Sequence, residues 1–251
     1  MLIFAENSLI YPGSPYPRGD WEPSIRFEDV NFESADGTQL HGWFLEQPDA
    51  RENVLICHGN AENVAQSTEH MGHQFRKTLN ANVFVFDYRG YGKSEGSPNE
   101  SGVSADTQSA LDWFCNRLDV ASDKVIVVGH SIGGGPAVDV AVNNPVKALV
   151  LQRTFASLVE PAQNRYWFVP VSLFMQNRFE SAKKIKNCSS PLFQSHGTLD
   201  QLIPIESGKK VFNNSPATTK RFYAIPEANH WTPLPNEYWS RLTDFVAEIN
   251  R

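Results

Sequence analysis

Short apolar runs alternate with amphipathic stretches along most of the chain. The runs are VLIC (54–57), VFVF (83–86), VIVV (125–128), ALVL (148–151), PLF (191–193) and RFYAI (221–225). Between these runs, apolar side chains recur at helical spacing at Leu111, Phe114, Cys115 and Leu118. After them, a last helix is expected to start near Pro235, with apolar side chains at Leu242, Phe245, Val246 and Ile249. Strands that alternate with helices carrying one apolar face are typical of βαβ units. The pattern therefore predicts an α/β fold, with a parallel sheet and helices on both of its faces.

The N-terminal part of the chain has a different pattern. Strands are expected near residues 24–33 and 39–46, and Asp36-Gly37 between them indicates a hairpin, so these two strands are expected to be antiparallel. Residues 1–23 are expected to form an extended arm on the body of the protein, because prolines occupy positions 12, 15, 17 and 23.

Residues 155–190 interrupt the alternation of strands and helices. They follow a strand of the predicted parallel sheet, at the edge where ligands bind in open α/β folds. We therefore expect a short lid, in which the apolar side chains of Trp167, Phe168, Phe174 and Met175 line a substrate pocket. The alternative is an ordinary crossover whose aromatic side chains pack into the core.

Length and charge exclude several classes of protein. A chain of 251 residues is long enough to bury a substantial core, and we expect a single domain over residues 1–251. The net charge of −6, from 22 Lys and Arg against 28 Asp and Glu, argues against a phosphate-binding surface and therefore against nucleic acid as a partner. No apolar run approaches the ~18–20 residues that a membrane-spanning helix needs, so no stable membrane span is expected.

The cysteines suggest a reducing compartment. Cys57, Cys115 and Cys188 are odd in number and lack CxxC spacing, which is typical of reduced thiols and favours a cytoplasmic location. The apolar start of the chain reaches Glu6 too soon to be a secretory signal. An anchor upstream of Met1 and the oligomeric state are left open.

The strongest chemical motif is Gly129-His130-Ser131-Ile132-Gly133, directly after the strand that ends at Val128. A G-x-S-x-G turn between a strand and a helix holds its serine in a strained conformation, and its glycines are needed because neighbouring backbone packs too close for a Cβ. The motif predicts Ser131 as a nucleophile exposed above the sheet. A phosphate-binding turn is disfavoured, because neither G-x-x-x-x-G-K-[ST] nor G-x-G-x-x-G is present here.

A serine nucleophile needs a histidine base and a carboxylate that orients it. In folds with this turn, the acid and then the base follow the serine along the chain. Of the histidines after Ser131, His230 lies in the loop before the last helix and is favoured over His196, which ends a predicted strand. Asp200 follows that strand closely. The order and spacing therefore predict Ser131, Asp200 and His230 at the C-terminal ends of three different strands.

The tetrahedral intermediate of acyl transfer requires two N–H donors. Ile132 is expected to supply one, and Asn60, in the loop after the first apolar run, the other. The side chain of His58 in this loop is expected to take part in the loop's own hydrogen bonds. Asp87 is a rival acid, but it precedes the nucleophile and is expected to brace its turn by pairing with Arg89.

Taken in order, these motifs resemble the α/β-hydrolase superfamily across nearly the whole chain. They are HGNA (58–61), DYRGYGKS (87–94), GHSIG (129–133), GTLD (197–200) and NH (229–230). The short lid and the run DQLIP (200–204) narrow the resemblance to a small-lid subgroup that includes bud-emergence-suppressor-like proteins and protein depalmitoylases. The resemblance implies an eight-stranded, mostly parallel sheet and a Ser131–Asp200–His230 triad that works through an acyl-enzyme.

We therefore expect a serine hydrolase acting on small-molecule carboxylic esters or thioesters, with a preference for short- to medium-chain acyl groups. No cofactor is expected and no metal, because His70 and His73 lack a third ligand at recognisable spacing and H-E-x-x-H is absent. The alternatives are an acyl-protein thioesterase or depalmitoylase, a serine peptidase, and a catalytically silent binding protein. The silent protein is disfavoured because no triad member is missing.

Overall fold

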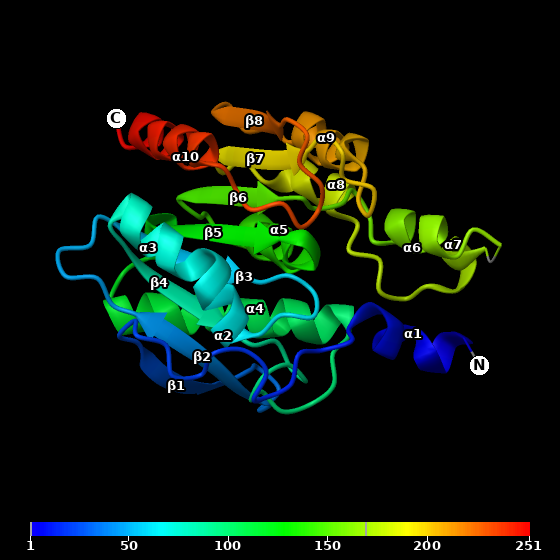
Figure 1. The fold of residues 1–251 in the computed structure, drawn as a ribbon, viewed down its shortest axis with the longest axis horizontal. Helices are drawn as coiled ribbons and strands as arrows, with labels where there is room; N and C mark the ends of the chain where they lie inside the picture. The colour runs from blue at the N-terminus through cyan, green and yellow to red at the C-terminus, as the bar shows by residue number, and fades with distance from the viewer. Residues whose placement is uncertain (1, 169) are drawn as a thin grey trace.

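The computed structural model of the chain describes residues 2–168 and 170–251, and within them eight strands form one twisted sheet (Figure 1). Its strands are Glu28–Glu33 (β1), Gln39–Leu45 (β2), Glu52–Cys57 (β3), Ala81–Phe86 (β4), Val125–His130 (β5), Ala148–Gln152 (β6), Leu192–Gly197 (β7) and Lys220–Ile225 (β8). They lie in the order β1-β2-β4-β3-β5-β6-β7-β8, with β2 antiparallel to both β1 and β4 and the other pairs parallel. The predicted eight-stranded, mostly parallel sheet with an antiparallel N-terminal hairpin is confirmed.

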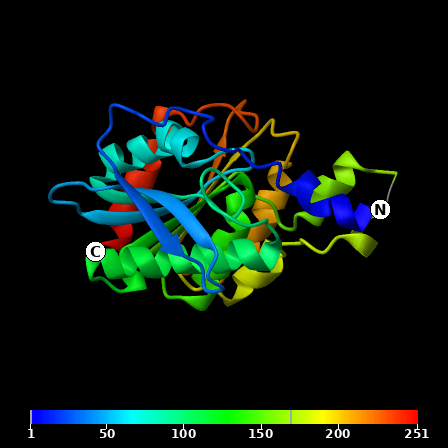
Figure 2. The same ribbon diagram turned by 90° about the horizontal axis from the view of Figure 1, so that it is seen from below.

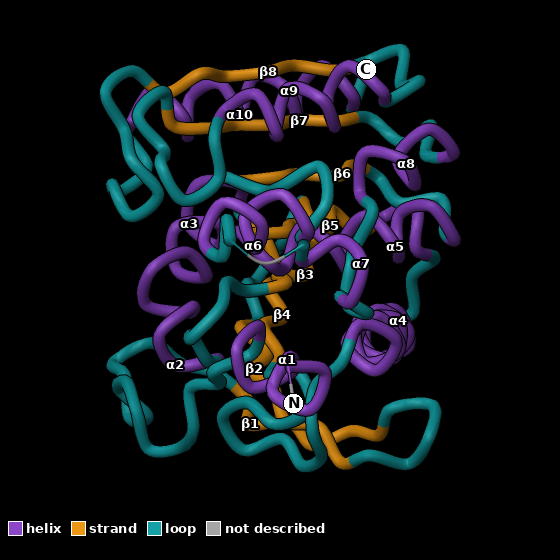
Figure 3. The backbone as a smooth tube through the Cα atoms, turned by 90° about the vertical axis from the view of Figure 1, so that its right-hand side faces the viewer, coloured by secondary structure: helices purple, strands orange, loops and turns teal. Residues whose placement is uncertain are grey.

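Helices cover both faces of the sheet. They are Leu2–Ile10 (α1), Val64–Ser67 (α2), His73–Leu79 (α3), Glu100–Leu118 (α4), Gly134–Asn143 (α5), Val159–Arg165 (α6), Val171–Phe174 (α7), Ser181–Lys184 (α8), Ile205–Asn214 (α9) and Asn236–Ile249 (α10). Shorter turns occupy Thr68–Gly72 (η1, a π-helical turn), Ser122–Lys124 (η2), Ser131–Gly133 (η3) and Ile185–Asn187 (η4). One face carries α2, α3 and α10, and the other carries α4, α5, α8 and α9 (Figure 3).

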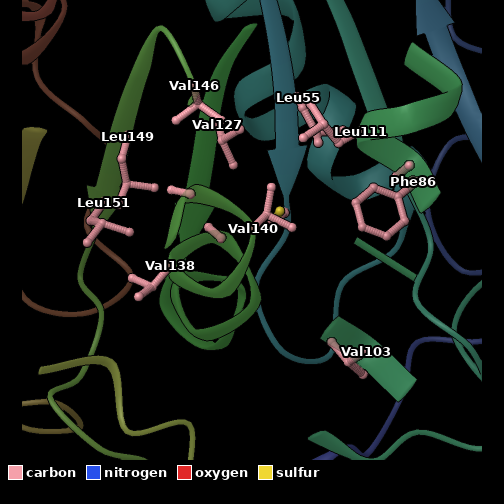
Figure 4. Close-up of a cluster of buried hydrophobic side chains, with 14 of the residues drawn as sticks. Leu55, Phe86, Val103, Leu111, Val127, Val138, Val140, Val146, Leu149 and Leu151 are labelled. Atoms are coloured by element: carbon pink, nitrogen blue, oxygen red, sulfur yellow. The ribbon is translucent and has the colours of Figure 1, made fainter. Parts of the chain in front are cut away.

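Each central strand is buried on both sides, and this explains its continuous apolar run. In β3, Val54 and Ile56 pack towards α3 and α10, whereas Leu55 and Cys57 pack towards α4 and α5. The same alternation continues through β5 and β6. Figure 4 shows Leu55 among the side chains of the core on the face that carries α4 and α5. Two cores therefore hold the sheet in place, and the polar groups of the site lie beyond its strand ends.

The starts and ends of the helices follow local chemistry. α4 begins after Asn99, whose side-chain oxygen accepts the Gly102 N–H at 2.8 Å, and it ends at Asp119 in the left-handed region. α10 begins directly after Pro235, as predicted. In the hairpin, Gly37 has a φ of 84°, a conformation that favours glycine.

The N-terminal segment differs from the prediction, because residues 2–10 form helix α1 in place of an extended arm. This stretch contains neither glycine nor proline, and Pro12 follows two residues after its end. From Tyr11 onward the chain has little regular structure and contacts the body, with an isolated bridge between Pro15 and Gly92. The prolines therefore determine the conformation only of the segment that contains them.

The segment 155–190 divides into two parts. In Figures 1 and 2, α6 and α7 project beyond the sheet and lie beside α1. By contrast, α8 and η4 pack against α5 and α9, and Ile185 and Cys188 are buried in the core. Among the helices described, none is long and apolar enough to cross a membrane.

Candidate active site

Ser131 lies directly after β5 in a strained conformation, with a φ of 53°. Left-handed backbone at a residue other than glycine costs ~1–3 kcal/mol and persists only where the surroundings enforce it. A Cβ on Gly133 would lie 2.2 Å from the carbonyl oxygen of Cys57, so only glycine fits there. The Thr154 hydroxyl donates a hydrogen bond to the Ser131 carbonyl at 3.0 Å. Close packing and this hydrogen bond hold the turn that presents Ser131.

The structure brings Ser131, His230 and Asp200 together, although they follow three different strands. Ser131 Oγ lies 3.0 Å from His230 Nε2, and His230 Nδ1 lies 2.8 Å from Asp200 Oδ2. All three side chains are largely buried. The imidazole therefore bridges a hydroxyl and a carboxylate, which is the arrangement in which a histidine accepts a proton from a serine.

Asp200 is held as an anion by several donors. Its Oδ1 accepts the backbone N–H groups of Leu202 at 3.0 Å and Ile203 at 2.9 Å, and its Oδ2 lies 3.5 Å from His196 Nε2. Burial opposes ionisation of this carboxyl, but the hydrogen bonds from His196, His230 and Ile203 outweigh it and hold the pKa of Asp200 well below its usual range. The negative carboxylate favours a proton on His230 Nδ1, and Nε2 is then the acceptor that faces Ser131.

The loop that carries His230 is fixed at its backbone. The Arg153 guanidinium donates to the carbonyl oxygen of His230 at 2.9 Å and also to that of Thr232. Asn229 Oδ1 accepts the backbone N–H groups of Trp231 and Thr232. The position of the imidazole therefore depends on Arg153, which directly follows β6 and was not identified from the sequence.

His130, the residue before Ser131, places a second imidazole beside the first. The ring centres of His130 and His230 are 6.2 Å apart. Burial lowers the pKa of His130 to about 4, and the nearby charges of His230 and Arg153 add to this effect while Glu62 opposes it. His130 is therefore neutral at pH 7 and places no positive charge beside His230.

The loop after β3 contains the other predicted donor, Asn60. Its side chain is held on three sides: Nδ2 donates to the Ile10 carbonyl at 2.6 Å, and Oδ1 accepts from Tyr91 Oη at 2.8 Å and from the Ala61 N–H at 3.0 Å. The backbone N–H of Asn60 donates to none of the residues described. Its predicted role beside Ile132 in an oxyanion hole stays a prediction. The ring of His58 lies 2.8 Å from the Gly59 carbonyl, as expected for a side chain held within the loop.

The expected pairing of Asp87 with Arg89 is wrong. Asp87 is fully buried and accepts the Val64 N–H at 2.9 Å, while Arg89 forms ion pairs with Asp106 and Asp36, each at 2.8 Å. The chain turns after β4, so the two side chains point to different neighbours. Asp87 therefore fixes the start of α2, and Arg89 links α4 to the hairpin.

The four apolar residues assigned to the lid differ in their exposure. Trp167, Phe168 and Phe174 are 79%, 69% and 50% exposed, whereas Met175 is buried. None of the four lines the cavity of about 450 Å³ that borders His230. That they line an acyl pocket stays a prediction.

The cavity lies next to His230, between α3, α10 and the ends of β5 and β6. Its lining residues are Glu62, His70, Met71, Gln74, His130, Gln152, Arg153, His230, Trp231, Thr232, Pro233, Leu234 and Trp239. The cavity was not predicted from the sequence, because its residues come from four separate segments and only His130 and His230 belong to a motif. Within residues 2–168 and 170–251, no three His, Cys, Asp or Glu side chains are grouped as metal ligands.

Comparison with known proteins agrees with this architecture. Residues 52–182 match the model of the α/β hydrolase fold family. The chain is 30% identical to the protein bem46 of Schizosaccharomyces pombe, over 97% of this chain and 86% of that protein. It is 28% identical to the α/β hydrolase domain-containing protein WAV2 of Arabidopsis thaliana, over 99% of this chain and 89% of that protein. The structure of the Pyrococcus furiosus esterase Pf2001 superposes with a TM-score of 0.74 at 20% identity, covering 94% and 97% of the two chains.

The chain belongs to the α/β hydrolase fold family. Within that family, its similarity to bem46 confirms the resemblance to bud-emergence-suppressor-like proteins.

Proposed function

We propose that this protein is a serine hydrolase that cleaves carboxylic esters through an acyl-enzyme. The observation that carries the proposal is the continuous chain from Ser131 Oγ to His230 Nε2 at 3.0 Å and from His230 Nδ1 to Asp200 at 2.8 Å. Such a chain activates a hydroxyl that is otherwise a poor nucleophile. No cofactor is needed for this chemistry.

In the first half of the reaction, Ser131 Oγ attacks the ester carbonyl carbon while His230 Nε2 takes the hydroxyl proton. The resulting oxyanion is stabilised by the backbone N–H groups of Ile132 and Asn60. His230 then donates the proton to the leaving oxygen, and the alcohol departs. In the second half, His230 removes a proton from water, which attacks the carbonyl carbon of the acyl-enzyme; His230 then returns the proton to Ser131 Oγ as the bond to the serine breaks and the acid is released. Asp200 stabilises the imidazolium in both halves.

The acyl group is proposed to be short to medium in length. The part of the lid that projects from the body is small, and Trp167, Phe168 and Phe174 can cover only a limited acyl chain. Each buried methylene contributes ~0.8 kcal/mol, so kcat/KM rises with chain length until the pocket is full. Amides are poorer substrates, because their leaving amine must be protonated as it departs.

The test combines an active-site probe with a substrate series. A fluorophosphonate should label the wild type and not Ser131→Ala, and kcat/KM should be measured for p-nitrophenyl esters of two to sixteen carbons and for matched amides. Ser131→Ala and His230→Ala should each lower kcat by ~10³-fold or more, and Asp200→Asn by less. Absence of labelling would indicate a catalytically silent protein. Loss of activity in His196→Ala but not in His230→Ala would contradict the choice of base.

The exposed aromatic side chains favour a second candidate, an acyl-protein thioesterase or depalmitoylase. Trp167 and Phe168 offer exposed apolar surface outside the body of the protein, and in this candidate a long acyl chain lies along that surface without being covered by it. A maximum of kcat/KM at palmitoyl length, with thioesters preferred to esters, would favour this candidate. Amide turnover that rivals ester turnover would favour a peptidase.

A further inference from the structure

The cavity beside His230 has a polar wall that the catalytic steps do not use. Gln152, Arg153 and His130 all line it. In each of them one buried polar atom has no hydrogen-bond partner among the described residues: Gln152 Oε1, Arg153 Nε and His130 Nδ1. Gln152 is fully buried and Arg153 is 5% exposed. Buried polar atoms in folded proteins are rarely left unpaired, so this wall is suited to a ligand that supplies the missing partners.

The position of the cavity indicates which part of a substrate it meets. Ser131 is adjacent to His130 in the chain and lies 3.0 Å from His230 Nε2, so the cavity borders the triad on the side of its base. In ester cleavage His230 must deliver a proton to the leaving oxygen, and the alcohol part therefore passes this imidazole. The cavity volume of about 450 Å³ is within the range of small-molecule sites.

We propose that this cavity binds the alcohol part of the ester and that this alcohol is neutral and polyhydroxylated, such as glycerol or a sugar. The proposal rests on the hydrolase function proposed above. A hydroxyl both donates and accepts hydrogen bonds, so several hydroxyls can pair with the acceptor Gln152 Oε1 and with the donor Arg153 Nε. A simple alkyl alcohol has only its reacting oxygen and leaves these atoms unpaired.

The charges around the cavity argue against an anionic alcohol. Glu62 lies in the wall, 3.5 Å from His70, and places a carboxylate in the same cavity as the Arg153 guanidinium. Burial opposes ionisation of Glu62, but hydrogen bonding to His70 and the charges of nearby histidines outweigh it and lower its pKa to about 2. An anion would meet both this carboxylate and the Gln152 oxygen. Met71 and Trp239 provide apolar surface for the carbon atoms of a polyol.

The experiment compares esters that share one acyl group and differ in the alcohol. Butyrate esters of ethanol, glycerol, glucose and glycerol 3-phosphate are assayed with the wild-type protein. Glyceryl or glucosyl butyrate should exceed ethyl butyrate in kcat/KM by on the order of tenfold, the effect of about two neutral hydrogen bonds. The glycerol and glucose esters distinguish a small polyol from a sugar.

Two variants test whether the preference comes from this cavity. Gln74→Trp places a large ring on the exposed face of α3 at the cavity wall, and Gln152→Met removes the unpaired oxygen at nearly equal side-chain length. Both variants should bring the ratio of kcat/KM for the polyol ester to kcat/KM for the ethyl ester towards one. The matched control is Lys77→Trp, on the same helix but outside the lining, which should keep the wild-type ratio.

Binding without turnover gives an independent measurement. Saturation-transfer NMR of glyceryl butyrate should show contact with the glycerol protons in Ser131→Ala, and this contact should be lost in Ser131→Ala/Gln74→Trp. A wild-type ratio of about one, or a ratio that Gln74→Trp leaves unchanged, would overturn the proposed subsite while ester hydrolysis itself stands. A higher kcat/KM for the glycerol 3-phosphate ester than for the neutral polyol esters would contradict the neutral polyol and indicate that the cavity binds an anionic alcohol. If no ester is hydrolysed and the fluorophosphonate does not label Ser131, the hydrolase function fails, and the NMR measurement alone decides whether the cavity binds a polyol.

Discussion

Lowering the pH from 7 to 5 should destabilise the folded protein through His130. Its pKa is about 4 in the folded state, because the imidazole is buried, whereas an unfolded chain protonates histidine at ~6.5. Protonation is therefore disfavoured by folding. The stability that depends on the neutral ring is fully present above pH ~6.5 and is lost as the pH falls towards 4.

The size of the effect follows from proton linkage. A histidine that titrates at ~6.5 when unfolded and at about 4 when folded lowers the free energy of unfolding by about 2 kcal/mol between pH 7 and pH 5. Glu62 also has a lowered pKa, but its contribution is lost only as the pH falls from ~4.5 to about 2, below this window. His70 acts in the opposite direction, because hydrogen bonding to Glu62 raises its pKa.

The assay is urea unfolding at pH 7, 6 and 5 for the wild type, His130→Gln and His73→Gln. The difference in free energy of unfolding between pH 7 and pH 5 is compared within each protein, so the cost of the substitution itself cancels, and the effect of His70 is common to all three. The decrease should be about 2 kcal/mol smaller in His130→Gln than in the wild type. His73 is exposed on α3, so its variant should behave like the wild type. An equal decrease in His130→Gln and the wild type would refute the reasoning.

Two substitutions test the packing that supports the site. Asn177→Ala should lower the free energy of unfolding by about 3 kcal/mol in urea titrations, because the buried Asn177 amide links α1, Tyr11 and the start of α4, and the hydrogen-bond partners of that amide would be left unpaired. The control Gln176→Ala, at an exposed neighbouring position, should lower it little. Equal decreases in the two variants would contradict this explanation. Gly133→Ala should destabilise by at least ~2 kcal/mol, because its Cβ would overlap backbone, whereas Gly72→Ala, with its nearest neighbour at 3.5 Å, should change thermal stability by less than ~1 kcal/mol.

The central strands β3, β4, β5 and β6 were predictable because they are apolar and buried on both faces. In β7 the apolar run covers only residues 191–193, and the strand, predicted to end at His196, extends to Gly197. Gln194 and His196 are polar and yet fully buried, and each pairs with a carbonyl of the connection that follows, Gln194 Nε2 with Gly208 at 2.8 Å and His196 Nε2 with Ile203 at 2.7 Å. Such partners exist only in the folded chain, so composition alone does not show that Gln194 and His196 are buried.

The grouping of Ser131, His230 and Asp200 was predicted from the sequence because chain order limits the choice of a proposed acid and base. The pairings of charged side chains could not be found in this way. Arg89 lies two residues from Asp87, yet it pairs with Asp36 and Asp106, which are distant in the chain. Their proximity in sequence suggested that Asp87 and Arg89 form a pair, but the turn after β4 directs the two side chains to different neighbours.

What local sequence can and cannot predict is clearest where β5 and β6 end side by side. His130 is paired with Gln152 across these strands, and the next residues, Ser131 and Arg153, both adopt left-handed conformations with φ of 53° and 51°. The turn at Ser131 has a recognisable motif, because its glycines are required by close backbone contacts. The turn at Arg153 has none, and the hydrogen bonds of the Arg153 side chain go to the carbonyls of His230 and Thr232 in a loop far along the chain. One strand end therefore presents Ser131, the proposed nucleophile, and the neighbouring one fixes the loop of His230, the proposed base, and only the first can be recognised from local sequence.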